Sequence, residues 1–255
     1  MTSALIGYTG FVGGNLLRSR TFDDRFNSAN VHEVAGRSYD EVVFSAAKAE
    51  KWRINQDPET DAAHITDLER ILTSFQASRL VLISTVDVYG SPVDVDEDTV
   101  VETEGLHPYG LHRLRLEAFA RANFDDVLVV RLPGLFGPGI KKNVIFDLMN
   151  DNNVDRIHPG GEFQYYDLRR LADDIEVARA AGLDLVNLAT EPVSTARLAR
   201  EAFGVELDVP ENGAAGRYDM RTRHSGLWGR DDGYLASADD VVEAVTSFVE
   251  SERAR

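Results

Sequence analysis

Three glycines near the start of the chain have a spacing that could hold phosphate groups. Gly7, Gly10 and Gly13 follow the apolar run 4–6 and lead into residues 12–20, which we expect to be helical. A turn of glycines has no side chains to keep phosphates away, and backbone N–H groups at a helix N-terminus favour negative charge. The motif predicts a bound dinucleotide and therefore redox chemistry; for glycines alone, a turn that holds nothing is the alternative.

Hydroxyl and phenol side chains form a second group that could do chemistry. The apolar run 80–85 ends in Ser84 and Thr85. Hydroxyls at the carboxyl end of a parallel strand lie where open α/β sheets bind ligands. Farther along, Tyr109 and Arg113 are four residues apart, so they share one face of a helix. For this pair, an ordinary exposed helical contact is the alternative.

These segments together resemble the extended branch of the short-chain dehydrogenase/reductase superfamily, specifically the NAD-dependent epimerase/dehydratase family. The resemblance rests on the G-x-x-G-x-x-G turn, on residues 84–90 (Ser-Thr-Val-Asp-Val-Tyr-Gly) and on Tyr109. It implies that Thr85 hydrogen-bonds the reacting oxygen of the substrate and that Tyr109 exchanges a proton with that oxygen. Free tyrosine has a pKa of about 10, so Tyr109 needs a neighbouring cation to work near neutrality.

The chain departs from the family at the cationic residue that follows this tyrosine in the helix. The family has a lysine four residues later, whereas this chain has Arg113. Arginine keeps the positive charge, but its planar group is larger than an ammonium. Two hypotheses therefore stay open. The chain is an enzyme adapted to arginine, or it is a dinucleotide-binding sensor or scaffold with little or no turnover.

The resemblance also implies which residues border the cofactor. We expect a second strand at 31–35, whose end in the family would place an acidic residue on the ribose of NAD. Ala35 stands there, and Arg37 and Ser38 follow, which suits the 2′-phosphate of NADP. The expected cofactor is NADP, with NAD as the alternative. The candidate cofactor-binding residues are Gly7, Thr9, Gly10, Phe11, Val12, Gly13, Arg37, Ser38, Ala46, Ala47, Lys48 and Pro133.

The residues that follow Thr85 indicate which type of reaction the chain catalyses. The family's dehydratases have two adjacent acids after the threonine, whereas this chain has a valine and then Asp87. Ketoreduction, alcohol oxidation or epimerisation is therefore favoured, and Asp87 is a candidate substrate contact. For a sugar nucleotide, the family often has an asparagine where this chain has Gly134, and Arg221 and Arg223 are candidates for the diphosphate. A solvated basic loop is the alternative for these arginines.

Apolar runs alternate with helical stretches, which predicts an α/β fold with a Rossmann-type doubly wound parallel sheet. We expect this dinucleotide-binding domain in residues 1–140 and a smaller C-terminal substrate-binding lobe in residues 141–255. One strand and helix near 163–190 could return to the main domain. Strands are expected at 4–6, 31–35, 41–45, 80–85, 127–132, 163–168 and 185–189, with helices at 12–20, 58–78, 109–123, 143–150, 169–181, 194–203 and 239–250.

Composition limits the partners. The net charge of −16, from 43 acidic and 27 basic residues, repels nucleic acid and anionic membranes. The chain has no cysteine, which excludes disulfides and thiolate metal sites, and its six histidines are too scattered to predict a metal site. We see no membrane-spanning stretch. A cytoplasmic enzyme with a small-molecule substrate fits best, and the resemblance implies a homodimer that pairs through helices 58–78 and 109–123.

Overall fold

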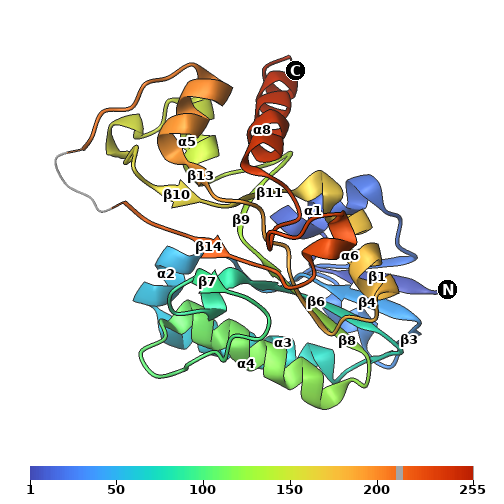
Figure 1. Cartoon of the computed structure of the whole chain (residues 1–255). Coiled ribbons are helices and arrows are strands. Elements are labelled where there is room, and N and C mark those ends of the chain that lie inside the picture. The colour runs from blue at the N-terminus through green and yellow to red at the C-terminus, as the bar shows by residue number, and fades with distance from the viewer. Residues whose placement is uncertain (211–214, 255) are drawn as a thin grey trace. The chain divides into compact units, whose positions relative to one another are not determined.

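Apolar runs in the first half of the chain form the middle of one parallel sheet. In the computed structural model, which describes residues 1–210 and 215–254, six strands lie in the order β12-β8-β6-β4-β1-β2 (Figure 1). β1 pairs in parallel with β2 and β4, and β4 pairs in parallel with β6. The strands are β1 (Ser3–Ile6), β2 (Asp24–Phe26), β4 (Glu41–Phe44), β6 (Leu80–Thr85), β8 (Val127–Leu132) and β12 (Leu185–Asn187).

Helices cover both faces of this sheet. Every residue of β1, β4, β6 and β8 is buried, as expected for parallel strands with no solvent face. Helix α1 contacts α6, α3 contacts α4, and Figure 1 shows the two pairs on opposite sides of the sheet. The predicted doubly wound α/β fold is confirmed. The helices are α1 (Phe11–Ser19), α3 (Pro58–Leu72), α4 (Pro108–Asn123) and α6 (Leu171–Ala180).

The chain divides into two units, which are described separately. Unit 1 consists of Met1–Gly90, Thr99–Arg131 and Leu171–Val186, and unit 2 consists of Ser91–Asp98, Leu132–Arg170 and Asn187–Arg255. Unit 1 holds the sheet, apart from the last residue of β8 and of β12. The sequence-based division at residue 140 stays a prediction about domains.

The prediction of a strand at 31–35 is wrong. Val31–Val34 form the 3-10 helix η1, in which only Val34 is buried, and the second strand of the sheet is β2. β2 lies at the edge of the sheet and buries only Phe26, so it has no apolar run that the sequence could reveal. The polar stretch 23–30 therefore contains this edge strand.

Four other short elements of unit 1 were not predicted. The helix expected at 58–78 ends at Leu72, because the chain turns there and forms β5, which pairs in parallel with β3. A short helix, α2, precedes α3, and the turn η2 follows β6. The bounds are β3 (Ser38–Tyr39), β5 (Gln76–Ala77), α2 (Lys51–Gln56) and η2 (Val86–Val88).

Unit 2 consists of short strand pairs and helices. β9 pairs in parallel with β11, β7 in parallel with β14, and β10 antiparallel with β13. The predicted helix 194–203 begins as α7 and continues as the π-helix η5. The segment 208–232, for which the sequence predicts no helix or strand, contains β14 and η6, and its residues 211–214 lie outside the described part. The elements are β7 (Val93–Val95), β9 (Gly134–Phe136), α5 (Val144–Asn150), η3 (Val154–Arg156), β10 (Glu162–Phe163), β11 (Tyr165–Asp167), η4 (Leu168–Arg170), β13 (Val193–Ser194), α7 (Thr195–Leu198), η5 (Ala199–Phe203), β14 (Asp219–Met220), η6 (Ser225–Trp228) and α8 (Ala238–Arg253).

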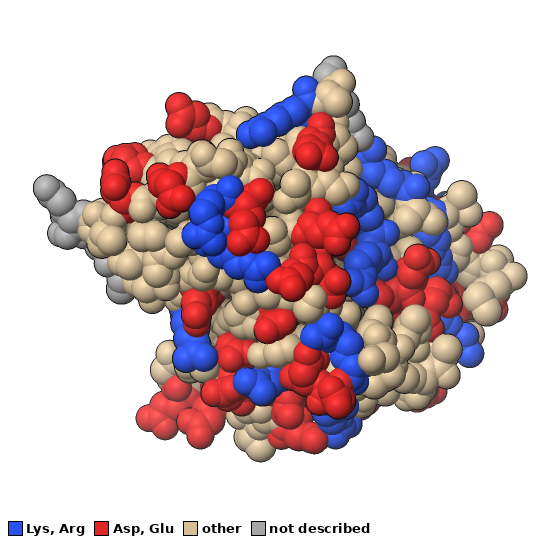
Figure 2. Space-filling view, turned by 45° about the horizontal axis from the view of Figure 1, so that its top comes forward, with Lys and Arg blue, Asp and Glu red and all other residues tan. Residues whose placement is uncertain are grey.

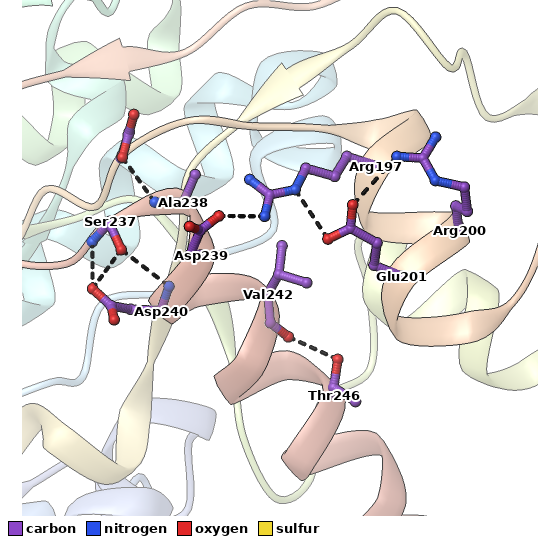
Figure 3. Close-up of polar contacts among 10 residues, drawn as sticks. Arg197, Arg200, Glu201, Ser237, Ala238, Asp239, Asp240, Val242 and Thr246 are labelled. Carbon is purple, nitrogen blue, oxygen red and sulfur yellow. Dashed lines mark hydrogen bonds and ion pairs between the residues drawn. The ribbon is translucent and has the colours of Figure 1, made fainter.

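Polar contacts fix the start of α8 within unit 2 (Figure 3). Ser237 and Asp240 form a capping box: the Ser237 hydroxyl accepts from the Asp240 N–H at 3.1 Å, and the Asp240 carboxylate accepts from the Ser237 N–H at 2.8 Å. Arg197 of α7 pairs with Asp239 and also with Glu201, the latter at 3.0 Å. These contacts tie α7 to the first turn of α8.

Acidic and basic side chains are interspersed over the face that Figure 2 shows. Exposed ion pairs such as Arg70–Asp67 and Arg115–Glu69 contribute little to stability. The excess of acid therefore bears mainly on solubility and on which partners are attracted. In residues 1–210 and 215–254, no helix combines the length and the apolar character that crossing a membrane requires.

Candidate functional site

A turn of glycines joins β1 to α1 at the carboxyl end of the strands. Gly7 has a φ of +96°, which favours glycine, and a Cβ atom on Gly7 would lie 2.6 Å from the carbonyl oxygen of Ser45. A Cβ atom on Gly13 would lie 2.4 Å from the carbonyl oxygen of Gly7. These glycines let the turn, the first turn of α1 and the end of β4 pack backbone against backbone.

The first turn of α1 leaves backbone N–H groups available to an anion. The helix follows Gly10, and among the residues described no side chain caps it and no acid lies in the first turn with Phe11 and Val12. Thr9 and Gly10 are exposed. Unpaired N–H groups and the helix dipole favour negative charge at such a terminus. The turn therefore fits the pyrophosphate of a dinucleotide.

Replacing Gly13 by alanine is expected to destabilise the protein by about 1–3 kcal/mol, because the added methyl group would overlap the backbone of Gly7. The matched control is Gly14→Ala, since a Cβ atom there would lie 3.6 Å from the carbonyl oxygen of Tyr8, an ordinary contact. Alanine also favours a helix more than glycine does. Urea denaturation followed by circular dichroism measures both variants, and equal stabilities would contradict the close packing.

Because the second strand is β2 and not 31–35, other residues follow it than the sequence predicted. Arg37 pairs with Asp24 at 2.8 Å. Ser38 lies in β3, just before β4, whose first residue pairs with Ser3 at the start of β1. Arg37 and Ser38 thus do not follow the second strand directly in the chain, although the Arg37 guanidinium lies 5.4 Å from the ring centroid of Phe26 at the end of β2. Their role at a 2′-phosphate stays a prediction.

Asn27 is the residue that follows β2 directly. The carbonyl oxygen of Phe26 accepts a hydrogen bond from Gly7 N at 2.8 Å. Asn27 Nδ2 donates to Tyr8 Oη at 3.1 Å. The end of β2 is therefore bound to the glycine turn through both backbone and side chain, and the turn itself includes a tyrosine that the sequence reasoning passed over.

Within unit 1, the start of α4 packs against the end of β6. Thr85 is the last residue of β6, and Tyr109 is the second residue of α4. Gly110 permits a close approach, because a Cβ atom there would lie 2.2 Å from the carbonyl oxygen of Asp87. His107 Nδ1 accepts a hydrogen bond from Gly110 N at 3.0 Å and caps the helix. The helix start is thus held against η2, which directly follows Thr85.

The phenol of Tyr109 is 5% exposed and its pKa reflects opposing effects. Burial raises the pKa of Tyr109, because it disfavours the phenolate. The positive charge of Arg113 lowers this pKa, the negative charge of Asp87 raises it, and hydrogen bonding with Thr85 and Arg113 lowers it. The net direction is upward from the ordinary value, so the cation offsets only part of the burial.

Arg113 lies one helical turn after Tyr109 and is 3% exposed. Its guanidinium carbon lies 4.7 Å from the centroid of the Tyr109 ring, within the range of a cation–π contact. Arg113 Nη2 donates to the backbone carbonyl of Lys48, and Nη1 lies 3.7 Å from a carboxylate oxygen of Asp61. The guanidinium therefore lies between Tyr109 and the segment that follows β4.

Two charged residues of this region were missed by the sequence reasoning. Lys51 of α2 pairs with Asp87 at 2.5 Å, and Asp61 of α3 pairs with Arg113 and lies 2.8 Å from His112 Nδ1. α2 has six residues, too few to show a helical period, and no local motif marks Asp61 as a partner of α4. Only the tertiary structure brings these groups to Tyr109.

The remaining candidates divide between the units. Ala46 and Ala47 of unit 1 pack against the core, and the Lys48 side chain is exposed. Pro133 and Gly134 belong to unit 2, where Gly134 pairs with a residue of β11. Their cofactor and substrate roles stay predictions.

The two arginine candidates of unit 2 are paired with acids. Arg221 pairs with Asp94 at 3.0 Å, and Arg223 pairs with Asp98. A diphosphate role for Arg221 and Arg223 stays a prediction, and it would require these ion pairs to break. In the described residues, no three histidine, aspartate or glutamate side chains form a group that could hold a metal ion.

Comparisons with known proteins agree on one family and fold. The family model described as "NAD dependent epimerase/dehydratase family" matches residues 21–169. A dTDP-4-dehydrorhamnose reductase from Clostridium acetobutylicum is 15% identical, with a TM-score of 0.74 over 99% of this chain and 100% of that one. RMD from Pseudomonas aeruginosa, complexed with NADPH, is 18% identical, with a TM-score of 0.72 over 99% and 100%. TunA, an NAD-dependent NDP-hexosamine 5,6-dehydratase, is 18% identical, with a TM-score of 0.75 over 100% and 99%. A comparison with curated proteins gives no match.

Proposed function

The chain belongs to the NAD-dependent epimerase/dehydratase family and is an NAD(P)-dependent enzyme, and from this premise we propose that it oxidises, reduces or epimerises a hydroxyl or ketone group of a sugar nucleotide. The observation that carries the proposal is the contact of Tyr109 with Thr85 and Arg113 in unit 1. These side chains come from two elements, β6 and α4, that meet at the carboxyl end of the sheet.

In the proposed reaction, Tyr109 moves the proton. Oxidation of an alcohol removes a hydride from carbon and a proton from oxygen, and NAD(P), when bound, supplies the hydride acceptor. Tyr109 Oη takes the proton as a phenolate and returns it in the reverse direction. The Thr85 hydroxyl donates a hydrogen bond to the same substrate oxygen, and Arg113 favours the phenolate by its charge. The glycine turn and the N-terminus of α1 would hold the pyrophosphate.

Reduction, oxidation or epimerisation is proposed rather than dehydration because one acid is absent. Val86 follows Thr85 directly, and Asp87, the only acid of η2, is paired with Lys51. The solved structures that are similar in fold include MoeE5 in complex with UDP-glucuronic acid and NAD and with UDP-glucose and NAD. We propose a sugar nucleotide as the substrate class on that likeness and on the family. A cytoplasmic location and a homodimer through α3 and α4 belong to the same proposal.

The test combines coenzyme and substrate. Purified protein is incubated with NAD⁺, NADP⁺ or their reduced forms and a panel of nucleotide sugars, with absorbance of the reduced coenzyme and chromatography of the products as readouts. The proposal predicts coenzyme-dependent oxidation, reduction or epimerisation of at least one member. Coenzyme binding without any conversion would instead favour the alternative of a sensor or scaffold, which the arginine at position 113 first suggested.

We further propose that NAD(H) is preferred over NADP(H). Residues 27–30, which follow β2, are Asn-Ser-Ala-Asn and carry no cation for a 2′-phosphate. Asn27 instead has amide groups that suit ribose hydroxyls, and its Nδ2 already contacts Tyr8. Fluorescence titration should show tighter binding of NADH than of NADPH. Asn27→Arg should improve the affinity for NADPH relative to NADH by about tenfold, the effect of one charge-assisted hydrogen bond. Tighter binding of NADPH by the unaltered protein would contradict this preference.

A further inference from the structure

The guanidinium of Arg113 is a buried charge and needs a counter-charge. Its side chain is 3% exposed, and taking an unpaired cation out of water costs several kcal/mol, on the order expected for any buried ion. The backbone carbonyl of Lys48 accepts from Nη2, but a carbonyl carries no full charge. A carboxylate must therefore neutralise this arginine if it is to stay beside Tyr109.

Asp61 supplies that carboxylate. Of the acids in the described chain, only Asp61 forms an ion pair with Arg113, at 3.7 Å between Oδ2 and Nη1. Asp61 is itself 4% exposed and lies in the first turns of α3, a different helix from Arg113. Nη1 of Arg113 and Oδ1 of Asp61 are buried, and neither has a hydrogen-bond partner in the described structure. The pair therefore acts through charge rather than through a direct hydrogen bond.

We propose that Asp61 is a positioning residue, which holds Arg113 over the ring of Tyr109 so that an arginine can serve where the family has a lysine. The proposal rests on the proposed role of Tyr109 as the acid/base. Asp61 touches neither Tyr109 nor the reacting atoms; it acts through Arg113. Its position also explains how a longer, planar cation is kept buried at this point, since Lys48 and Asp61 hold two different nitrogens of the guanidinium.

Other titratable groups face the same place from each element around it. His64 of α3 has its pKa lowered, first by burial and then by the charge of Lys48, with a further lowering by Arg113. His107 has its pKa lowered by burial and by Lys51, so it stays a neutral cap of α4. In the described part of the chain, the titratable groups around Tyr109 and Arg113 include Lys48, Lys51, Asp61, His64, Asp87, His107 and His112. Asp61 is the carboxylate of this set that forms an ion pair with the guanidinium.

The direction of the effect separates positioning from simple charge screening. If Asp61 holds the guanidinium in place, Asp61→Asn releases it from the phenol, and Tyr109 ionises at a higher pH. If Asp61 only offsets the charge of a guanidinium that stays in place anyway, removal of the negative charge strengthens the positive field, and Tyr109 ionises at a lower pH. The two roles thus predict opposite shifts.

The experiment follows the ionisation of Tyr109 without coenzyme or substrate. The full chain is labelled with 3-fluorotyrosine, whose more acidic phenol titrates at lower pH than tyrosine, and its fluorine NMR spectrum is recorded against pH. Tyr109→Phe identifies the resonance. We expect Asp61→Asn to raise the midpoint by about one pH unit or more, which is a tenfold smaller phenolate fraction at a given pH below the midpoint.

Two comparisons make the result specific. Asp67→Asn removes an exposed carboxylate of the same helix, paired with Arg70 at 2.7 Å, and should leave the midpoint unchanged. In an Arg113→Met background, Asp61→Asn should cause no further rise, because the group through which it acts is gone. An unchanged or lowered midpoint in Asp61→Asn, or an equal rise in the Arg113→Met background, would overturn the proposal.

Folding is checked in the same series. If Asp61→Asn alone does not fold, the double variant Asp61→Asn/Arg113→Met should fold, because removing both members of a buried ion pair costs less than removing one. Failure of the double variant as well would also overturn the proposal. Since the NMR assay contains no substrate, it is separate from the proposed function. If Tyr109→Phe retained full turnover, the proposed function would be contradicted, whereas the role of Asp61 toward Arg113 would not be.

Discussion

Replacement of Tyr109 by phenylalanine is expected to lower turnover about 10²–10⁴-fold, the usual contribution of a general acid or base. The substitution removes one oxygen from a ring that is 5% exposed, so the packing at the start of α4 should persist. Coenzyme binding should also persist, because the glycine turn and α1 lie on other elements. Steady-state kinetics and a coenzyme titration measured on the same preparation separate the two effects.

The pH dependence of the unaltered enzyme follows from the same phenol. Alcohol oxidation needs the phenolate, so its rate should rise with pH toward the pKa of Tyr109. Ketone reduction needs the protonated phenol and should fall above that pKa. Because burial raises this pKa and Arg113 offsets only part of the rise, oxidation should be slow at neutral pH and faster in alkali. Tyr109→Phe should abolish this slope in both directions.

A matched control tests whether any buried phenol has this effect. Tyr39 is 6% exposed, its hydroxyl donates to Asp24 at 2.7 Å, and burial raises its pKa to about 12. It precedes β4, at the opposite end of the strands from the glycine turn. Tyr39→Phe should leave turnover and its pH profile unchanged. Equal losses in Tyr39→Phe and Tyr109→Phe, or no loss in either, would remove Tyr109 from the chemistry.

The sequence revealed those parts of the fold that are encoded locally. β4, β6 and β8 are fully buried, and each shows a short apolar run in the sequence, at 42–44, 80–83 and 127–130. The edge strand β2 buries one residue of three, so it has no apolar run from which it could be predicted. The valines that attracted the wrong assignment, Val31 and Val34, belong to a 3-10 helix whose burial is set by α3, which it contacts.

The candidate site shows the same division. Thr85, Tyr109 and Arg113 stand in segments whose local pattern marks them, and their positions on β6 and α4 follow from the sequence. The positions of Asp61 and Lys51 in the site do not follow from a local pattern. Their partners Arg113 and Asp87 lie 52 and 36 positions away in the sequence. A charge that is neutralised across elements leaves no periodic signal. The error in the second strand also removes the argument from strand order for Arg37, whose role stays a prediction.

A second buried ion pair, between Arg131 of β8 and Glu117 of α4, holds the elements of the site together. Arg131 Nη2 lies 2.7 Å from Glu117 Oε2, and both side chains are buried. The Ser84 hydroxyl donates to the same carboxylate, and Arg131 Nη1 donates to Tyr89 Oη at 2.8 Å. Ser84 immediately precedes Thr85, and Glu117 lies on the helix of Tyr109. The pair therefore links β8, β6 and α4, the elements that carry Thr85 and Tyr109.

Arg131→Met is expected to destabilise the protein by about 3–5 kcal/mol, because it leaves the carboxylate of Glu117 buried without a counter-charge. The double variant Arg131→Met/Glu117→Met should recover most of that loss, since neither charge remains. Arg115→Met is the matched control: Arg115 also lies on α4 and pairs with Glu69, but its side chain is 44% exposed, and its removal should cost about 1 kcal/mol or less. Urea denaturation monitored by circular dichroism gives all three values. If Arg131→Met costs no more than Arg115→Met, or if the double variant is no better than the single, the pair does not hold these elements together. The relative position of Thr85 and Tyr109 must then be set by other contacts, such as the close approach of Gly110 to Asp87 and the hydrogen bond from Tyr109 N to Asn55 Oδ1.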